Sequence, residues 1–167
     1  ILLAPISFLI AILIKCESRG PVFFRQQRVG KNGKLFTLYK FRSMRVDAPQ
    51  YAISPTEPGD PRITRVGRFL RHTSLDELAQ LINVAMGDMS LVGPRPEMPF
   101  IVAQYTPAQR QRLRVKPAIT GVWQLSADRA FQIHENIQYD LYYIQHRSFF
   151  MDCAILLHTF IFAMRGV

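Results

Sequence analysis

Two adjacent acids, Asp76 and Glu77, are the residues of this chain best suited to chemistry, and they follow an arginine-rich stretch that ends at Arg71. A carboxylate can attack phosphorus only if its own charge and that of the phosphate are screened. A Mg²⁺ ion, which prefers oxygen ligands, can provide this screening. Neighbouring carboxylates can divide the work, since one attacks while the other holds the metal. These residue types are those that phosphoryl transfer through an acyl-phosphate requires.

A second candidate lies within twenty residues, where the chain reads Gly87-Asp88-Met-Ser-Leu-Val-Gly93-Pro94-Arg95-Pro96. The two prolines restrict the backbone on both sides of Arg95 and would hold this arginine in place. Arg71 and Arg95 could then stabilise the charge on a transferring phosphoryl group. The alternative is that the proline-flanked arginine forms a plain surface turn.

The acid pair also has a purely structural explanation. Ser74 and Glu77 match a capping box, and acids are common in the first turn of a helix. Against this, the pair lies among arginines, and a helix N-terminus also stabilises a nearby phosphate. Both explanations stay open on the sequence alone.

The elements that must position these residues follow from periodicity. Apolar residues at helical spacing from Leu75 to Ala85 predict a helix that begins at Ser74 and ends at Gly87. Before it, four arginines recur at every third residue and would share one face of a short helix, as a phosphate site or as a solvated charged face: Arg62, Arg65, Arg68 and Arg71.

Other segments show clear local signals. Residues 22–29 and 35–43 flank Asn32-Gly33, which predicts a β-hairpin. Residues 47–61 contain four prolines and predict a mobile loop. Residues 107–116 predict a basic surface helix, residues 117–124 a turn with extended chain, and residues 131–146 a further helix.

Residues 1–14 carry no charge and would form a helix about 21 Å long, shorter than the roughly 30 Å of a bilayer core. Pro5 would kink it. Such uniform apolarity favours a membrane segment, either a truncated span or a re-entrant helix that turns back at Pro5, over a buried core helix. The chain begins at Ile1 rather than Met, so we expect this helix to be truncated. Residues 148–164 are also apolar but contain Asp152, which indicates an interfacial position or packing on the first helix.

Charge and cysteine content narrow the classes of function. Of the 21 Lys and Arg and 12 Asp and Glu, residues 15–71 hold 13 and 4, so the whole net charge of +9 lies there. Such a block suits anionic lipid, a phosphorylated substrate or nucleic acid. Cys16 and Cys153 are too few for a disulfide framework and indicate a reducing compartment. Beside an enzyme of phosphoryl transfer, the second hypothesis is therefore a non-catalytic basic module that binds membrane or nucleic acid. A third hypothesis is an inactive scaffold.

The chain resembles the bacterial sugar transferases, which are monotopic polyprenyl-phosphate phosphoglycosyl transferases. The similarity runs through nearly the whole chain, and its most specific part is the block from Ser74-Leu-Asp76-Glu77-Leu to Pro96. The other matching stretches are Gly20-Pro-Val-Phe-Phe-Arg-Gln-Gln-Arg28-Val-Gly30, Tyr39-Lys40-Phe-Arg42-Ser-Met44, Asp60-Pro-Arg62-Ile-Thr-Arg-Val-Gly67, Lys116-Pro-Ala-Ile-Thr-Gly121-Val-Trp123-Gln and Tyr139-Asp140-Leu-Tyr-Tyr143.

This resemblance implies transfer of a sugar-1-phosphate from a UDP-sugar to undecaprenyl phosphate with release of UMP. The step would begin the synthesis of an exopolysaccharide, capsule, O-antigen or glycoconjugate. The resemblance also implies that Asp76 is the nucleophile and that Glu77 is the Mg²⁺ ligand. It places further residues in or near the site: Lys40, Arg71, Pro94, Arg95 and Asp140. After Gln124, many members carry Gly-Arg where this chain reads Leu125-Ser-Ala127-Asp128-Arg129, and Arg129 is the candidate for that arginine.

The resemblance also implies an α+β architecture on the cytoplasmic face of the bacterial inner membrane. We expect a helix over residues 1–15 that enters the membrane and is broken at Pro5. A small hairpin and a mainly helical catalytic domain over residues 16–167 would follow and lie on the membrane lipids. No nucleic-acid partner is expected, and homo-oligomerisation stays open.

Overall fold

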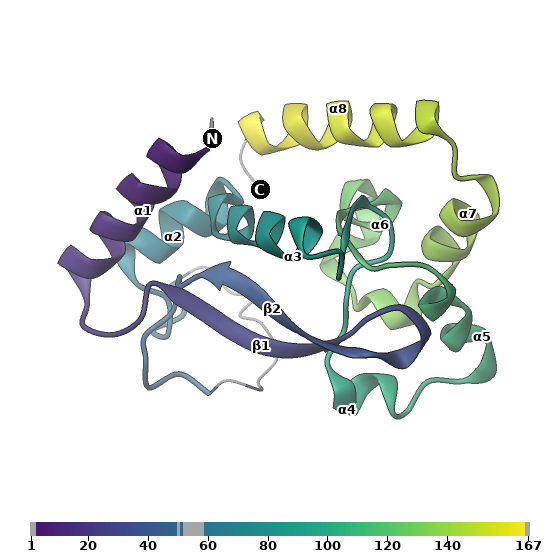
Figure 1. Cartoon of the computed structure of the whole chain (residues 1–167), viewed down its shortest axis with the longest axis horizontal. Coiled ribbons are helices and arrows are strands. Elements are labelled where there is room, and N and C mark those ends of the chain that lie inside the picture. Colours follow the sequence, from purple (N-terminus) through teal and green to yellow (C-terminus); the bar gives the residue numbers. More distant parts are fainter. Residues whose placement is uncertain (1–2, 50, 52–58, 166–167) are drawn as a thin grey trace.

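The computed structural model describes residues 3–49, 51 and 59–165, and it combines helices with two small sheets (Figure 1). The α+β prediction is confirmed. In chain order the elements, with η for a 3-10 helix, are α1 (Ala4–Glu17), β1 (Phe23–Val29), η1 (Lys31–Gly33), β2 (Leu35–Phe41), α2 (Arg65–His72), η2 (Leu75–Gln80), α3 (Leu81–Ala85), β3 (Ser90–Val92), α4 (Pro99–Val102), α5 (Pro107–Arg110), η3 (Gln111–Arg114), β4 (Ala118–Thr120), α6 (Val122–Leu125), η4 (Ala127–Ala130), η5 (Ile133–Glu135), α7 (Gln138–His146) and α8 (Phe149–Arg165).

The predicted hairpin is confirmed and forms a long twisted ribbon through the molecule (Figure 1). β1 and β2 pair antiparallel, from Phe23 opposite Phe41 to Val29 opposite Leu35. The chain reverses at Asn32 and Gly33, which have φ of 57° and 81°. Asn and Gly are the residues that adopt this left-handed conformation most readily, so the turn follows directly from the Asn-Gly signal.

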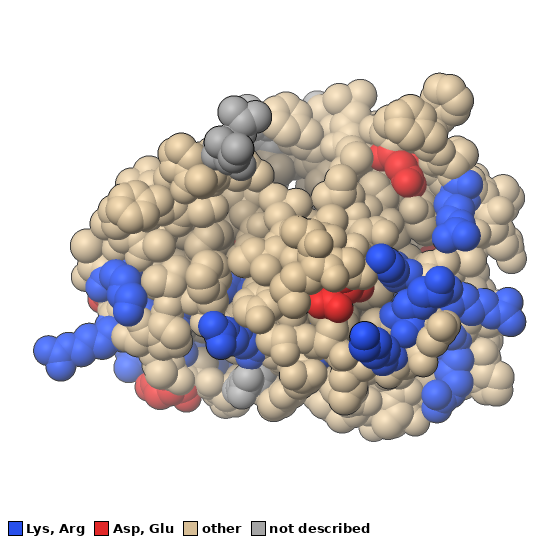
Figure 2. Space-filling view, in the orientation of Figure 1, with Lys and Arg blue, Asp and Glu red and all other residues tan. Residues whose placement is uncertain are grey.

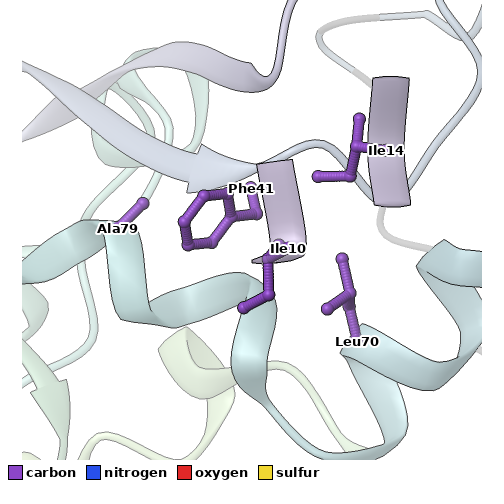
Figure 3. Close-up of a cluster of buried hydrophobic side chains, with 5 residues drawn as sticks. All are labelled: Ile10, Ile14, Phe41, Leu70 and Ala79. Carbon is purple, nitrogen blue, oxygen red and sulfur yellow. The ribbon is translucent and has the colours of Figure 1, made fainter. Parts of the chain in front are cut away.

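One core cluster joins α1 and α2 to the end of the hairpin. Ile10 and Ile14 of α1 meet Leu70 of α2 and Phe41 of β2, and Ala79 of η2 closes the cluster (Figure 3). These side chains are at most 4% exposed. The cluster therefore fixes α2 and η2, which carry Arg71 and Asp76, against the strand that carries Lys40.

Gly67 allows α2 to lie close to the end of the hairpin. A Cβ atom at this position would lie 1.9 Å from the carbonyl oxygen of Ser43, so only glycine fits without a shift of the backbone. The N-terminus of α2 is also tied to α1, because the Glu17 carboxylate accepts hydrogen bonds from the amides of Arg65 and Val66.

α1 packs through two residues and exposes the rest of its apolar surface. Phe8 is 69% exposed and Leu9 57%. Pro5 lies in the first turn of α1, where a missing N–H removes no helix hydrogen bond, so the described part of α1 has no interior proline. The predicted break at Pro5 would involve residues outside the described range and stays a prediction. Among the described helices, none combines the length and apolarity needed to cross a bilayer.

A second, two-stranded parallel sheet was not predicted. β3 pairs with β4, with Ser90 beside Ala118 and Val92 beside Thr120. Each strand has only three residues, which is too short for an alternating pattern to be recognised in the sequence. This sheet sets the end of β3, from which the chain enters the loop that carries Arg95.

Asn83, which is fully buried, connects α3 to the free edge of β2. Its side chain accepts a hydrogen bond from the Tyr39 amide at 3.0 Å and donates one to the Thr37 carbonyl at 2.7 Å. The Asn83 amide group thus replaces a neighbouring strand at this edge. The contact also sets the position of η2 and α3 along β2.

Two predicted helices were wrong in extent. Residues 107–116 do not form one basic surface helix. They contain two short elements, α5 and η3, and Arg112 of η3 is buried at 3% exposure. Residues 131–146 are helical as α7 only from Gln138, after the 3-10 turn η5. The predicted helix from Ser74 to Gly87 begins as the 3-10 helix η2, and Gly87 follows its end with φ of 81°.

The remaining predictions have mixed outcomes. The apolar stretch over residues 148–164 lies almost entirely in α8, whose Phe149 and Phe150 are 77% and 82% exposed. Its predicted interfacial position or packing on the first helix stays a prediction. Cys16 and Cys153 are free and exposed, as expected without a disulfide framework. The mobile loop predicted for residues 47–61 falls mostly on residues outside the described range, so it stays a prediction.

Candidate active site

The acid pair lies in the first turn of η2, and Ser74, the residue before η2, has a left-handed conformation with φ of 55°. The capping box proposed for Ser74 and Glu77 does not form, because the Ser74 side chain caps no amide. The Glu77 carboxylate instead turns toward two cations from other elements. The capping-box part of the structural explanation is therefore wrong, whereas the acids do lie in the first turn of η2, as that explanation also expected.

Glu77 joins Lys40 and Arg95 into one cluster. Its Oε1 atom lies 2.6 Å from Lys40 Nζ and 2.7 Å from Arg95 Nη2, and its Oε2 atom lies 3.5 Å from Arg95 Nη1. Burial opposes the charged carboxylate, but Arg95 and Lys40 outweigh it and hold the pKa of Glu77 far below its usual range. Glu77 is therefore ionised over the whole physiological pH range.

Asp76 is buried at 7% exposure and has the opposite electrostatic setting. Burial raises its pKa above the ordinary aspartate value, and the negative charge of Glu77 adds to this effect. Lys40, Arg71 and Arg95 act in the other direction. The two neighbouring carboxylates thus differ in chemistry, as expected for groups with different roles: Glu77 is a fixed anion, and Asp76 is a poorly solvated and more basic one.

Asp76 forms part of the wall of a cleft with a volume of about 590 Å³. The cleft lies along the end of the hairpin and the chain that leads into α2. It is strongly basic, because the described residues of its lining include seven Lys and Arg and one acid, Asp76. The basic residues are Arg25, Arg28, Lys40, Arg42, Arg45, Arg62 and Arg71.

Several of these cations have structural partners. Arg42 is buried and donates to the carbonyls of Ser18 and Arg19, which ties the end of α1 to β2. Arg62 pairs with Asp60 at 2.7 Å. Arg65 and Arg68 of α2 are exposed, as a solvated charged face requires. Arg71 lines the cleft, and so does Arg62, which precedes α2 and so does not share a helix face with the others. A phosphate-binding role for the two cleft residues stays a prediction.

The other sequence-predicted residues lie at different distances from the acids. Pro94 and Pro96 are buried, so the alternative of a plain surface turn is wrong. Arg129 does not line the cleft, and its guanidinium lies 4.2 Å from the centroid of the Phe162 ring of α8. Asp140 is 3% exposed and pairs with Arg112 at 2.7 Å, which places it behind Arg95 instead of beside Glu77.

Sequence reasoning missed this buried group behind Arg95. Arg112 pairs with Glu97 at 2.8 Å and with Asp140, and Tyr105 donates a short hydrogen bond to Glu97. His134 lies 3.1 Å from the other oxygen of Glu97. Four basic residues alternate with other residue types from Arg110 to Lys116. The sequence therefore did not distinguish Arg112, which is buried, from its basic neighbours. A weak signal was available in the two apolar residues of this segment, Leu113 and Val115, which indicate that part of it faces the core.

Comparison with known proteins places the chain in a family. The sequence model for "Bacterial sugar transferase" matches residues 1–166. Among similar proteins, the "Galactosyl transferase CpsE" of Streptococcus agalactiae serotype III is 44% identical over 84% of this chain and 34% of its own length. The "Exopolysaccharide production protein PSS" of Rhizobium leguminosarum bv. phaseoli is 41% identical over 95% of this chain and 86% of its own length.

A third relative is the "UDP-glucose:undecaprenyl-phosphate glucose-1-phosphate transferase" of Escherichia coli K12. It is 41% identical over 95% of this chain, which spans 36% of the relative's length. The chain thus spans about a third of the CpsE and Escherichia coli proteins but most of the Rhizobium protein. The family match covers almost every residue, including the acid pair and the Arg95 loop. This chain belongs to the bacterial sugar transferase family.

Proposed function

We propose that this protein transfers a sugar-1-phosphate from a UDP-sugar to undecaprenyl phosphate and releases UMP. The observation that carries the proposal is the position of Asp76, which is buried in the wall of a basic cleft beside a carboxylate that two cations hold. A diphosphate with an attached nucleoside and sugar needs a large and positively charged site. The family and the name of the Escherichia coli relative support the same substrates.

The chemistry divides into two displacements at one phosphorus atom. In the first, an Oδ atom of Asp76 attacks the phosphorus that bears the sugar, and the bond from this phosphorus to the bridging oxygen breaks. UMP leaves with that oxygen, and the sugar-1-phosphate stays on Asp76 as an acyl-phosphate. In the second, an oxygen of undecaprenyl phosphate attacks the same phosphorus, the bond to Asp76 breaks, and the free carboxylate is restored.

The surrounding residues prepare Asp76 for this role. Poor solvation by water raises the pKa of Asp76 and keeps the carboxylate reactive once it is ionised. Lys40 and Arg71 line the same cleft and would neutralise charge on the entering phosphates. Glu77 holds Lys40 and Arg95 in place, so these cations are positioned before the substrate arrives.

The residues present fit a Mg²⁺ site of the kind that is completed by substrate phosphates. Mg²⁺ is usually held by one or two carboxylates together with phosphate oxygens and waters. Among the described residues, no group of three or more His, Cys, Asp or Glu could form a full protein cage. Glu77 Oε1 lies close to two cations, whereas Oε2 has a longer contact of 3.5 Å with Arg95 Nη1, so Oε2 is the oxygen more accessible to a metal. Bound there, Mg²⁺ would neutralise phosphate charge as a Lewis acid.

We further propose that the protein acts at the cytoplasmic face of the bacterial inner membrane, with α1 and α8 facing the lipids. Figure 2 shows no Lys or Arg on the surface over most of α8 and the upper part of α1, whereas the blue side chains gather below and at the right-hand end. The most exposed apolar side chains of these helices are Phe8, Leu9, Phe149, Phe150, Leu157 and Phe160. Apolar helices that lie on a bilayer would bring the cleft close to a lipid-bound acceptor.

The test is UMP release in nanodiscs of anionic bacterial lipids with Mg²⁺, undecaprenyl phosphate and a panel of UDP-sugars. We expect the parent to release UMP with at least one sugar and Asp76→Asn to release none, because the amide is nearly isosteric but a very poor nucleophile. Glu135→Gln, at an exposed acid of η5, is the matched control and should behave as the parent.

The covalent step has a separate test. A UDP-sugar labelled in the sugar, added without undecaprenyl phosphate, should label the parent protein with one sugar-phosphate per chain and leave Asp76→Asn unlabelled. UMP release without labelling would favour direct transfer between the two substrates. If the folded parent releases no UMP from any sugar but binds RNA in a salt-sensitive way, the non-catalytic module is the better explanation.

A further inference from the structure

Arg95 lies on a loop that has no regular secondary structure of its own. Pro94, Pro96 and Glu97 are nevertheless buried. Each carbonyl from Pro94 to Glu97 accepts a hydrogen bond from another segment, two from backbone amides and two from arginines. The bonds run from Ala118 N to Pro94 O (2.8 Å), from Arg112 Nη2 to Arg95 O (2.8 Å), from Arg28 Nη1 to Pro96 O (3.2 Å) and from Val29 N to Glu97 O (3.0 Å).

Arg112 is deeply buried, at 3% exposure. Its Nη1 atom lies 2.8 Å from Glu97 Oε2 and 2.5 Å from the Tyr105 hydroxyl. Its Nη2 atom lies 2.7 Å from Asp140 Oδ2 and 2.8 Å from the Arg95 carbonyl. Two buried acids thus fix the guanidinium while the guanidinium holds the backbone of Arg95.

Neither Arg112 nor its two acidic partners line the basic cleft. Arg112 therefore has no direct path to a substrate there, in contrast to Arg28, which lines the cleft and also holds the loop. An effect of Arg112 on the reaction is therefore indirect, and its bond to the Arg95 carbonyl gives the most direct route. The chain of contacts is short, since Arg112 binds the Arg95 backbone and the Arg95 side chain binds Glu77, the residue next to Asp76.

We propose that Arg112 is a positioning residue for sugar-phosphate transfer: held by Glu97 and Asp140, it fixes the Arg95 backbone and so the guanidinium that orients Glu77. This inference rests on the proposed function for its kinetic readout but on the geometry alone for its structural one. It also gives Asp140 a role in the active site without a contact to the substrate.

Position 112 requires the planar guanidinium of an arginine. One guanidinium presents five N–H donors in fixed directions and can serve two carboxylates, a hydroxyl and a carbonyl at once. A lysine keeps the positive charge between the two acids but has one nitrogen with three donors on a flexible stem. Arg112→Lys therefore retains the charge pair and loses the fixed contact with the Arg95 carbonyl.

The experiment compares the parent with Arg112→Lys and with Arg114→Lys, a matched change at an exposed arginine of the same turn. We expect Arg112→Lys to lower kcat for UMP release by about 10-fold or more, since a small misplacement of a catalytic group is costly. The KM for the UDP-sugar should stay within about threefold, because uniform binding in the cleft is kept. Arg114→Lys should match the parent in both constants.

Amide hydrogen exchange supplies the readout that does not depend on activity. In Arg112→Lys, peptides that cover residues 90–98 should exchange faster, whereas peptides from β1 and β2 should exchange as in the parent. If exchange at residues 90–98 is unchanged, the proposal is overturned, even if the parent proves to lack UMP release. It is also overturned if kcat of the folded variant stays within about twofold of the parent, or if exchange rises equally in all peptides.

Discussion

Replacement of Asp140 by Asn tests the electrostatics of the buried group directly, because the two side chains have nearly the same shape. Burial raises the pKa of Asp140 to about 6, although Arg112 acts against this rise. In the unfolded chain the same group has its ordinary value of 3.8. Between these values the folded protein binds a proton that the unfolded chain does not.

The sign of the pH effect follows from this difference. A folded pKa above the unfolded one adds stability that is fully present below the unfolded pKa and is lost as the pH rises through the folded pKa. With values of 3.8 and about 6, the Asp140 contribution to the free energy of unfolding falls by about 1 kcal/mol between pH 5 and pH 7. The amide in the Asp140→Asn variant cannot titrate, so this variant should gain about 1 kcal/mol relative to the parent over the same range.

The assay is urea unfolding in mild detergent, followed by the fluorescence of Trp123, the only tryptophan of the chain. Parent and variant are measured at half-unit steps from pH 5 to pH 7, and only the difference between them is used, so the titration of other groups cancels. A difference that stays constant, or that moves in favour of the parent as the pH rises, would show that Arg112 stabilises the Asp140 carboxylate more than burial destabilises it. The electrostatic reasoning would then be refuted.

Three further predictions concern other parts of the molecule. Gly67→Ala should lower the free energy of unfolding by about 2–3 kcal/mol, measured by the same urea assay, because the new Cβ would overlap the Ser43 carbonyl; equal stability would contradict the close approach of α2. The kcat for UMP release should rise with pH through a pKa above the ordinary aspartate value as Asp76 ionises, and a profile that is flat from pH 4 upward would speak against a raised pKa. Chelation of Mg²⁺ should stop UMP release by the parent and its restoration should recover it; full activity in excess chelator would exclude the metal.

The local part of the fold could be predicted from the sequence. Two residues, Asn32 and Gly33, are enough to indicate the turn of the hairpin. The exposed helices α1 and α8 correspond to long apolar stretches of the sequence. The acid pair and Arg95 were predicted as site residues, because their residue types suit phosphoryl transfer and their motif resembles a known family. The structure adds that Lys40 and Arg95 converge on Glu77.

The non-local part could not be predicted. β3 and β4 are three residues long, and their pairing depends on segments that lie 28 positions apart in register. Arg112 looks like its exposed neighbour Arg114, and only the arrival of two acids from distant segments makes its burial favourable. In the same way, Ser74 and Glu77 match a capping box in the sequence. In the structure, the Glu77 carboxylate instead binds Lys40 and Arg95, which come from distant segments.

Asn83 has a consequence for the behaviour of the protein before it is fully folded. The edge of β2 that does not face β1 would offer free N–H and C=O groups to another chain if the Asn83 side chain were absent. Docking of α3 thus protects this edge from edge-to-edge aggregation, because the Asn83 side chain binds backbone groups of β2. A chain in which α3 docks late would expose this edge beside the apolar residues of β2, so changes at Asn83 should reduce soluble yield more than their effect on the folded structure suggests.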